Sequence, residues 1–149
     1  MTPRVVLWPD PPPMETGAPI PVMRFSSDSL VVAYACRNPE FPGWESGADP
    51  SHPGFDVWCA VLRFEGVAWH HFGAPGNEAL PTHPLYSAGM SYYGFWEVLD
   101  SLRVRPGSAL HHWIVTFHDE TLEVVAASAS VVSRREEGEG TRAIALKYA

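Results

Sequence analysis

Cysteine is scarce in this sequence, with only Cys36 and Cys59 among 149 residues. The two do not form a Cys-x-x-Cys pair, so their spacing excludes a zinc ribbon or a thioredoxin-type redox motif. Each lies in an apolar, strand-like run. We therefore expect two buried thiols on neighbouring strands, because cysteine packs as a small hydrophobe. A disulfide between them is the alternative in an oxidising compartment.

Long apolar runs are also lacking. No run approaches the roughly 20 residues that a membrane helix needs, and the stretch Met1 to Pro9 has no apolar segment typical of a secretory leader. From these absences we expect a soluble, cytoplasmic chain with no membrane partner.

Positive charge is limited, with ten basic residues against seventeen acidic ones and a formal net charge of −7. The basic residues are scattered, and the adjacent pair Arg134-Arg135 runs directly into Glu136-Glu137. Nucleic-acid binders need a clustered basic surface that displaces counterions, so we expect no nucleic-acid partner. Arginine far outnumbers lysine, which occurs only at Lys147. That bias is typical of GC-rich bacterial genomes and suggests a bacterial origin.

Proline and glycine are plentiful, with 15 and 12 residues, and they divide a chain whose length fits one domain, residues 1–149. A short strand is expected at Arg4–Trp8. Pro9–Pro21 is predicted to be a proline-rich surface connection, because proline lacks a backbone donor; a proline-type ligand for an aromatic groove is the alternative. Asn38–Gly54 is predicted to be a long loop rich in proline and glycine.

Strand signals dominate the ordered part of the chain. Leu30–Arg37 is rich in β-branched and aromatic residues and predicts a strand. Asp56–Gly73 contains two alternating runs around Glu65-Gly66, which predicts a β-hairpin with Phe64 opposite Val67 and Leu62 opposite Trp69. This pairing places one apolar set on the core face: Trp58, Ala60, Leu62, Phe64, Val67 and Trp69.

A second hairpin is predicted over His112–Ala126, with Asp119-Glu120 as its turn. Pairing outward from that turn sets Phe117 opposite Leu122, Val115 opposite Val124 and Trp113 opposite Ala126, and all six side chains face one side. The reverse face then carries His112, Ile114, Thr116, Glu123 and Val125.

Three further segments complete the expected fold. Residues 94–103 fit either a helix or a strand, and the aromatic content around Phe95–Asp100 favours a strand. Arg134–Gly140 is predicted to be a solvated charged loop, and Arg142–Tyr148 alternates like a last strand. Many short strands without alternating amphipathic helices predict a mainly β fold, although α+β is possible. We expect an antiparallel sandwich or a partly open barrel with at most one or two short helices.

The irregular segment Phe72–Asp100 is the best place for a binding site, because long irregular segments on a rigid sheet often carry function. Its polar and aromatic residues provide the binding candidates Asn77, Glu78, His83, Tyr86 and Tyr93. Exposed aromatics in the proline- and glycine-rich loops, Phe41, Trp44, Tyr92 and Tyr93, would suit a recognition surface or cover the open ends of the sandwich.

Catalytic and metal-binding patterns are weaker. Glu97, His118 and Asp119 provide carboxylates and an imidazole for acid–base chemistry, but no Gly-x-Ser-x-Gly elbow supports Ser87, Ser91 or Ser101 as a nucleophile. Adjacent histidines on a strand point to opposite faces and cannot chelate one ion together. A metal site would need a set such as His70, His112 and Glu123 from several strands, so we expect no metal and no cofactor.

The stretches "GNEALPTHPLY", "FWEVLDS" and "HWIVTFHDETLEVVA" resemble a family of small uncharacterised bacterial proteins. That family shares an Asn-(Asp/Glu)-Glu-Ala-Leu-Pro…His-Pro-Leu-Tyr stretch and a Thr-Phe-His-Asp-x-Thr hairpin, and the resemblance covers roughly residues 72–126. It implies kinship without an activity, and it favours His83, Tyr86, Glu97, His118 and Asp119 as site residues.

The combined pattern favours a non-catalytic module that binds a protein or a small molecule. The alternative is a small hydrolase-type or metal-binding enzyme that uses Glu97, His118 and His83. A concave pocket in which Glu97 or His83 meets His118 would favour the enzyme, whereas an apolar patch would favour the interaction module.

Overall fold

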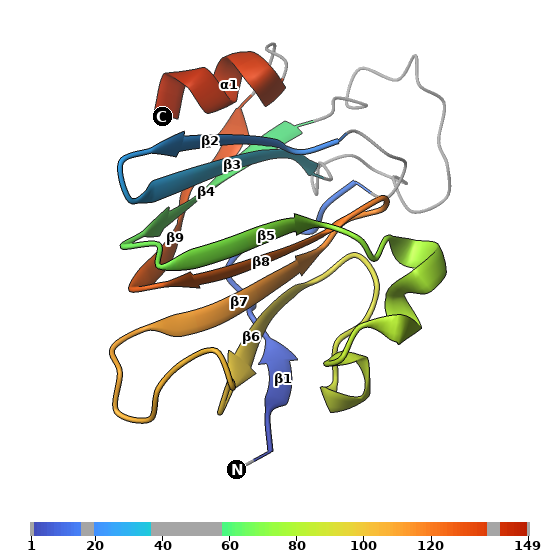
Figure 1. Cartoon of the computed structure of the whole chain (residues 1–149). Coiled ribbons are helices and arrows are strands. Elements are labelled where there is room, and N and C mark those ends of the chain that lie inside the picture. Colours follow the sequence, from blue (N-terminus) through green and yellow to red (C-terminus); the bar gives the residue numbers. More distant parts are fainter. Residues whose placement is uncertain (1, 16–19, 37–57, 137–140, 149) are drawn as a thin grey trace.

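The computed structural model describes residues 2–15, 20–36, 58–136 and 141–148, and within these ranges the chain forms two antiparallel sheets (Figure 1). The five-stranded sheet has the order β1-β6-β7-β8-β5, and the four-stranded sheet has the order β2-β3-β4-β9. Their bounds are β1 Arg4–Leu7, β2 Val22–Ser26, β3 Ser29–Cys36, β4 Trp58–Glu65, β5 Trp69–Gly73, β6 Phe95–Leu99, β7 His111–Thr116, β8 Thr121–Ala126 and β9 Ser128–Glu136. The expected mainly antiparallel β fold, a sandwich with few short helices, is confirmed.

Short helical segments lie outside the two sheets. The 3₁₀ helices η2 (Asn77–Thr82) and η3 (Tyr86–Ala88) lie beside the five-stranded sheet, and the α-helix α1 (Thr141–Tyr148) lies over the four-stranded sheet (Figure 1). In the described part of the chain, none of the helices has the length and apolar character needed to cross a membrane.

The core between the sheets is rich in aromatic rings. Trp8 lies 6.0 Å from Phe64 and 6.0 Å from Trp113, measured between ring centroids, and Phe64 lies 5.7 Å from Trp113. Tyr34 packs on Phe95 at 5.2 Å and donates its phenolic hydrogen to the carbonyl of Pro12 at 2.7 Å. Large rings at these separations bury much apolar area per residue, which lets a small domain form a stable core.

The hairpin predicted over Asp56–Gly73 is wrong. Residues 56 and 57 lie outside the described ranges, and β4 and β5 belong to different sheets. Gly66, at φ +64°, bends the chain across the sandwich instead of reversing it. The favoured two-residue hairpin turns need positive φ at the first central residue, whereas in Glu65-Gly66 the glycine holds the second position. The partners of β4 and β5 are β9 and β8, so the stretches 58–73 and 121–136 form one long bent ribbon that contributes to both sheets.

This crossing also corrects the predicted core face. Trp58, Ala60, Leu62 and Phe64 are buried in the core as expected, and Val67 packs against it. Trp69 instead lies on the outer face of the five-stranded sheet, and Phe72 of β5 packs inward, with its ring 6.2 Å from that of Phe117.

The hairpin of β7 and β8 is confirmed, with its register shifted by two residues from the prediction. Val115 pairs with Leu122, Trp113 with Val124 and Ile114 with Glu123. The Phe117 N–H donates to the Glu120 carbonyl at 3.0 Å, so the reversal is centred on His118-Asp119. A shift of two residues keeps every side chain on its predicted face, because strand side chains alternate with a period of two.

The C-terminal strand predicted over Arg142–Tyr148 is wrong, because this segment is the helix α1. Ala-Ile-Ala-Leu-Lys is a run of mostly strong helix formers, and the helix covers the outer face of β3 and β4. Ile144 and Ala145 are buried there, with Tyr148 packed against the same cluster. The guanidinium of Arg63 donates to the carbonyl of Tyr148 at 2.6 Å, which caps the helix C-terminus.

Several other predictions can be compared with the structure. The strand expected within residues 94–103 is present as β6, whereas Arg134 to Glu136 of the predicted charged loop belong to β9. Met14, in the predicted surface connection, is buried, and its backbone forms an isolated antiparallel β-bridge with Cys36. Residues 16–19 of that connection and the whole predicted loop Asn38–Gly54, with Phe41 and Trp44, lie outside the described residues.

The two cysteines are buried on neighbouring strands, as expected, and are not joined in a disulfide. Cys36 belongs to the core between the sheets, while Cys59 belongs to the cluster beneath α1. They therefore lie on opposite faces of one sheet, where their sulfur atoms cannot meet. Burial raises the pKa of the Cys36 thiol to about 12, which keeps it uncharged.

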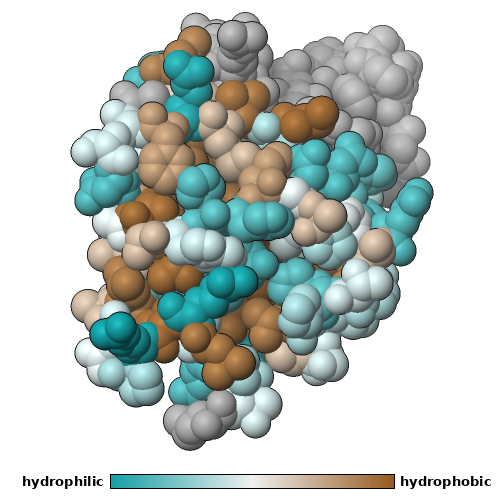
Figure 2. Space-filling model, in the orientation of Figure 1, coloured by the Kyte–Doolittle hydropathy of each residue, from teal (hydrophilic) through white to brown (hydrophobic). Residues whose placement is uncertain are grey.

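Each sheet also has an outer face. Helix α1 covers that of the four-stranded sheet, with Val31, Ala33, Cys59 and Val61 beneath it. The segment containing η2 and η3 covers part of the five-stranded sheet, where Val5, Leu80, Met90, Val98 and Ile114 form a small apolar cluster. Figure 2, in the orientation of Figure 1, shows brown hydrophobic groups interleaved with teal hydrophilic ones over the lower half of the view. Beside the small apolar cluster, the five-stranded sheet carries buried polar side chains.

Candidate functional site

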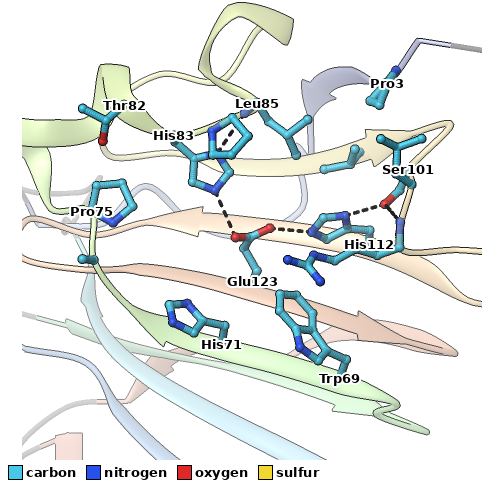
Figure 3. A pocket seen from close by; sticks show the side chains of 15 residues that line it. Pro3, Trp69, His71, Pro75, Thr82, His83, Leu85, Ser101, His112 and Glu123 are labelled. Atoms are coloured by element: carbon cyan, nitrogen blue, oxygen red, sulfur yellow. Dashed lines mark hydrogen bonds and ion pairs between the residues drawn. The ribbon is translucent and has the colours of Figure 1, made fainter.

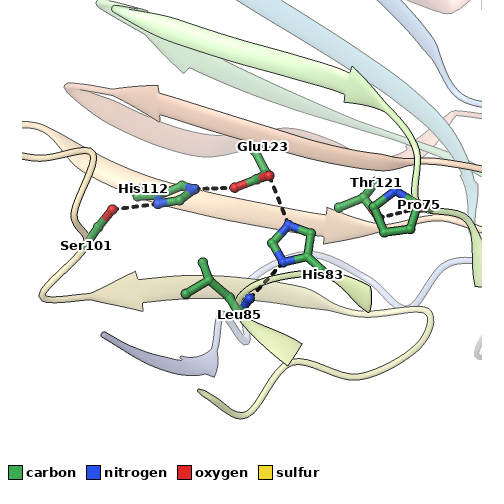
Figure 4. A network of polar contacts seen from close by, with 7 residues as sticks. All are labelled: Pro75, His83, Leu85, Ser101, His112, Thr121 and Glu123. Carbon is green, nitrogen blue, oxygen red and sulfur yellow. Dashed lines mark hydrogen bonds and ion pairs between the residues drawn. The ribbon is translucent and has the colours of Figure 1, made fainter. Parts of the chain in front are cut away.

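A buried polar network lies on the outer face of β7 and β8. Ile114 of β7 pairs with Glu123 of β8, and His112 lies two residues before Ile114 on the same face. Glu123 and His112 are 9% and 1% exposed, so the sheet places a carboxylate and an imidazole together with little access to water. Figure 4 shows Ser101, His112, Glu123 and His83 as one continuous row of contacts.

The contacts in this row are short. Glu123 Oε1 lies 2.9 Å from His112 Nε2, and its Oε2 lies 3.0 Å from His83 Nε2. At the far side of His112, Nδ1 lies 2.7 Å from Ser101 Oγ. One carboxylate therefore joins two imidazoles, and one imidazole connects the carboxylate to a hydroxyl.

The partners of the two imidazole rings indicate which ring nitrogens carry a proton. The Leu85 N–H donates to His83 Nδ1 at 3.0 Å, so that nitrogen bears no proton and His83 is neutral, donating from Nε2 to Glu123. An ionised carboxylate only accepts, so His112 Nε2 must donate to it as well. In the neutral His112 ring, Nδ1 is then bare and accepts a hydrogen bond from the Ser101 hydroxyl.

Glu123 is held as a carboxylate. Burial raises the pKa of its carboxyl group, but the hydrogen bonds and the electrostatic attraction of His112 and His83 together outweigh burial and lower that pKa to about 2. At neutral pH the network therefore contains a buried negative charge stabilised by two N–H donors.

His83 reaches the sheet from the end of η2. The His83 N–H donates to the Leu80 carbonyl at 2.9 Å, and the Tyr86 N–H donates to the His83 carbonyl at 3.0 Å. Leu80, 1% exposed, anchors η2 in the small apolar cluster beside the network. Just before η2, the Pro75 carbonyl accepts a hydrogen bond from the Thr121 hydroxyl at 2.7 Å, and Thr121 lies on the same face of β8 as Glu123.

Ser101 lies in the turn that follows β6. Asp100 has a φ of +55°, which turns the chain at this point, and the Arg103 N–H donates to Ser101 Oγ at 3.1 Å. When the His112 ring is neutral, the hydroxyl accepts one hydrogen bond from the backbone and donates its own hydrogen to His112 Nδ1. Ser101 is 8% exposed.

A pocket of about 560 Å³ opens over this row (Figure 3). Its walls are largely apolar and come from β5 and the residues after it, the end of η2 and the residues after it, β6 and the turn after it, and the N-terminal segment, as follows: Pro3, Trp69, His71, Ala74, Pro75, Thr82, Pro84, Leu85, Val98, Leu102 and Arg103. His83, Ser101, His112 and Glu123 also line it. The buried polar row is therefore accessible from a concave apolar surface.

An aromatic and cationic wall stands over the pocket. The guanidinium of Arg103 lies 3.7 Å from the ring centroid of Trp69, and the ring of His71 is stacked on Trp69 at 6.5 Å. Trp69 also meets His112 edge-on at 6.3 Å. Among the described residues the Arg103 guanidinium forms no ion pair, so its donors are available to a bound molecule.

His83 is the binding candidate that the structure brings to this pocket. Asn77 begins η2, and its buried Oδ1 accepts no hydrogen bond within the described ranges; Glu78 is exposed on the same helix. Tyr86 packs near the small apolar cluster with its ring 6.4 Å from Tyr92, which is 41% exposed. Tyr93 packs against the main core.

The weak catalytic candidates do not meet in the pocket. Glu97 lies 3.3 Å from His111 Nδ1, and Glu97 is on the opposite face of β6 from Val98. His118 and Asp119 contact each other at 2.7 Å in the exposed β7–β8 turn, with half-exposed side chains. The meeting of Glu97 or His83 with His118 that would have favoured the enzyme alternative therefore does not occur, and His83 contacts Glu123 instead.

Sequence reasoning missed Ser101, Trp69 and Arg103 as site residues and did not identify the joint role of His112 and Glu123. The signal for the last two was present, because the alternation of the β7–β8 hairpin places both on the reverse face with Ile114. The metal set of His70, His112 and Glu123 is not assembled, because the His70 ring contacts Phe25, with 4.6 Å between the ring centroids.

The site is not arranged as a metal centre. Within the part of the chain that the structure describes, no cluster of three or more His, Cys, Asp or Glu side chains could hold a metal ion. Both Nε2 atoms of His83 and His112 are occupied by the Glu123 carboxylate.

Comparisons with known proteins add no assignment. A scan against protein-family models, a search of curated proteins and a search of solved structures each returned no significant match. The resemblance to the small bacterial family described above stays a prediction, and the geometry of the pocket is the basis for any functional conclusion.

Proposed function

We propose that this protein binds a small organic molecule in the pocket between Trp69, Arg103 and the Glu123 network. The observation that carries the proposal is the convergence of four buried polar side chains on an otherwise apolar pocket of about 560 Å³. Ligand sites are commonly apolar cavities of about 300–1,000 Å³ with a few well-placed polar groups. The pocket therefore favours a role in binding small molecules instead of a role as a protein-interaction surface.

The charges indicate what the ligand should contain. Arg103 at the Trp69 wall would bind an anionic or strongly accepting group, while the Trp69 ring provides a flat apolar surface for a ring or a chain. Because both oxygens of Glu123 already accept from histidines, the network is pre-organised before a ligand arrives.

The compartment and partners follow the same proposal. A net charge of −7 disfavours nucleic acid, and two buried thiols on opposite faces of one sheet suit a reducing cytoplasm. We propose a cytoplasmic protein of bacterial type that works without a bound cofactor.

The test is a fragment screen by NMR, with small aromatic carboxylates as probes. Binding should shift the indole N–H signal of Trp69 and the backbone signals of residues 82–85 and 101–103. The variant Ala74→Trp should fill the exposed edge of the pocket and abolish these shifts, because Ala74 lines it. The matched control Ala109→Trp adds the same side chain at an exposed position outside this pocket and should leave the shifts unchanged. Shifts that persist in Ala74→Trp would contradict the proposal.

A further inference from the structure

We propose that Ser101, His112 and Glu123 form a nucleophilic relay, in which Ser101 attacks the acyl carbon of a carboxylic ester held in the pocket. This inference rests on the proposed binding of a small molecule there, and it adds a substrate class and a reaction. Three observations carry it: the hydrogen bond between nucleophile and base, the hydrogen bond between base and carboxylate, and the pocket onto which all three residues open.

The relay meets the geometric requirements of nucleophilic catalysis. A hydroxyl becomes a nucleophile when a base accepts its proton as it attacks, and the base must be held in the right tautomer by a third group. Here Glu123 accepts from His112 Nε2 at 2.9 Å, which leaves Nδ1 to accept from Ser101 at 2.7 Å. The two ring nitrogens therefore have fixed and different roles.

His83 fixes the direction of the hydrogen bonds to Glu123. Its Nδ1 accepts from the Leu85 N–H, so its Nε2 can only donate to Glu123. That donor holds one carboxylate oxygen and keeps the other turned to His112. His83 is therefore a positioning residue, which acts through Glu123 without touching the reacting atoms.

The reaction is balanced by groups in the site and by water. Ser101 Oγ forms a bond to the ester carbon while its proton moves to His112 Nδ1, and the C–O bond to the leaving alcohol breaks as that alcohol takes the proton. Water then attacks the acyl carbon and gives its proton to Nδ1, and the bond to Oγ breaks as Ser101 regains a hydrogen. The net change is ester plus water to acid plus alcohol.

A cation lines the same pocket as Ser101 and His112. Arg103 lies two residues after Ser101 and its N–H holds Ser101 Oγ, while its guanidinium is stacked on Trp69. Negative charge that develops on the carbonyl oxygen would be stabilised by such a donor in a site with little water.

The experiment uses diisopropyl fluorophosphate, which loses fluoride when a serine oxygen bonds to its phosphorus. Intact-mass analysis and peptide mapping of the full chain should find one adduct, on Ser101. Ser108 is an internal control, because the Leu110 N–H donates to its Oγ at 3.1 Å, as the Arg103 N–H does to Ser101 Oγ, and no histidine among the described residues contacts it. We expect Ser101 to react at least about 100-fold faster than Ser108, the range of a general base.

The variant Glu123→Gln tests the relay without removing a hydrogen bond. Since His83 can only donate, the amide oxygen must face it, and the amide N–H₂ must then donate to His112 Nε2. That forces the proton onto His112 Nδ1, which would donate to Ser101 instead of accepting from it. Labelling of Ser101 should fall at least about 100-fold, while an ¹H–¹⁵N spectrum shows a retained fold.

Each outcome separates the two proposals. No adduct on wild-type Ser101, or unchanged labelling in Glu123→Gln, overturns the relay; if aromatic carboxylates still shift the Trp69 signal, small-molecule binding stands. Absence of both labelling and shifts overturns both. If Glu123→Gln fails to fold, the comparison of Ser101 with Ser108 in the wild-type chain decides alone.

Discussion

The two outer faces of the sandwich are covered in different ways. Over the four-stranded sheet, α1 closes an apolar cluster with Ile144 and Ala145. Over the five-stranded sheet, an irregular segment with two 3₁₀ helices leaves a pocket and places His83 against a buried carboxylate. A regular helix covers its face with packed side chains, whereas the irregular segment provides backbone donors and turns that orient polar groups. The first face is therefore closed by packed apolar side chains, and the second carries a pocket with buried polar groups.

The largest effect should come from the apolar face. Ile144→Ala removes a side chain of α1 that is 1% exposed against the four-stranded sheet, and it should destabilise the fold by about 3 kcal/mol, because it leaves a cavity or releases the helix. Urea unfolding measures this. Leu146→Ala, at a residue 49% exposed on the same helix, should change the free energy of unfolding by less than about 0.5 kcal/mol. Equal losses in the two variants would show that α1 does not pack through Ile144.

The polar face should give the next largest effect. Glu123→Ala leaves the Nε2–H groups of His83 and His112 without their acceptor and should cost about 2 kcal/mol in the free energy of unfolding. Glu78→Ala, at an exposed carboxylate on η2, is the matched control and should be neutral within about 0.5 kcal/mol. A neutral Glu123→Ala would mean that the network adds nothing to stability.

Low pH should reduce the stability that ionised Glu123 contributes to the fold. The folded pKa of Glu123, about 2, lies below its ordinary value of 4.5, so ionised Glu123 contributes stability that is fully present above about pH 4.5. That contribution is lost as the pH falls towards about 2. Denaturant unfolding of the wild type and Glu123→Gln should therefore show a stability difference at pH 6 that narrows at pH 3. A constant difference between the two pH values would contradict the lowered pKa.

The smallest effect is expected at the mouth of the pocket. Arg103→Gln removes the cation over Trp69 and should cost about 0.5 kcal/mol in unfolding free energy, because the pair is exposed. The same variant should weaken the binding of aromatic carboxylates, measured by NMR titration. Arg105→Gln, an exposed arginine in the same loop, should change neither quantity. An equal loss of affinity in both variants would indicate general electrostatic attraction instead of a specific contact.

The difference between the two faces also explains what sequence could predict. Alternation identified the β7–β8 hairpin and the faces of its side chains, because strand burial repeats every two residues whatever the neighbours are. It failed at Gly66, since a local turn signal is the same whether the chain reverses in one sheet or crosses to the other. It failed again at Arg142–Tyr148, where a short apolar run fits both periods and tertiary packing on β3 and β4 selected the helix.

The site was harder to predict than the fold. His83 contacts Glu123 only because η2 lies on the outer face of the five-stranded sheet. No local sequence pattern shows on which side of a sheet an irregular segment will lie. Ser101 lacks a nucleophile motif, and its partner His112 is supplied by the next strand. His118 and Asp119, which the sequence offers as weak candidates, contact each other on an exposed turn and do not line the pocket.

The long ribbon of 58–73 with 121–136 has a consequence for how the protein folds and opens. Neither sheet can be completed until segments far apart in the chain have met, so folding should be slow and cooperative for a domain of this size. The same two stretches of chain contribute strands to both sheets. Because β8 continues directly into β9 of the other sheet, a molecule that bound at Glu123 on β8 would also restrain the motion of β9.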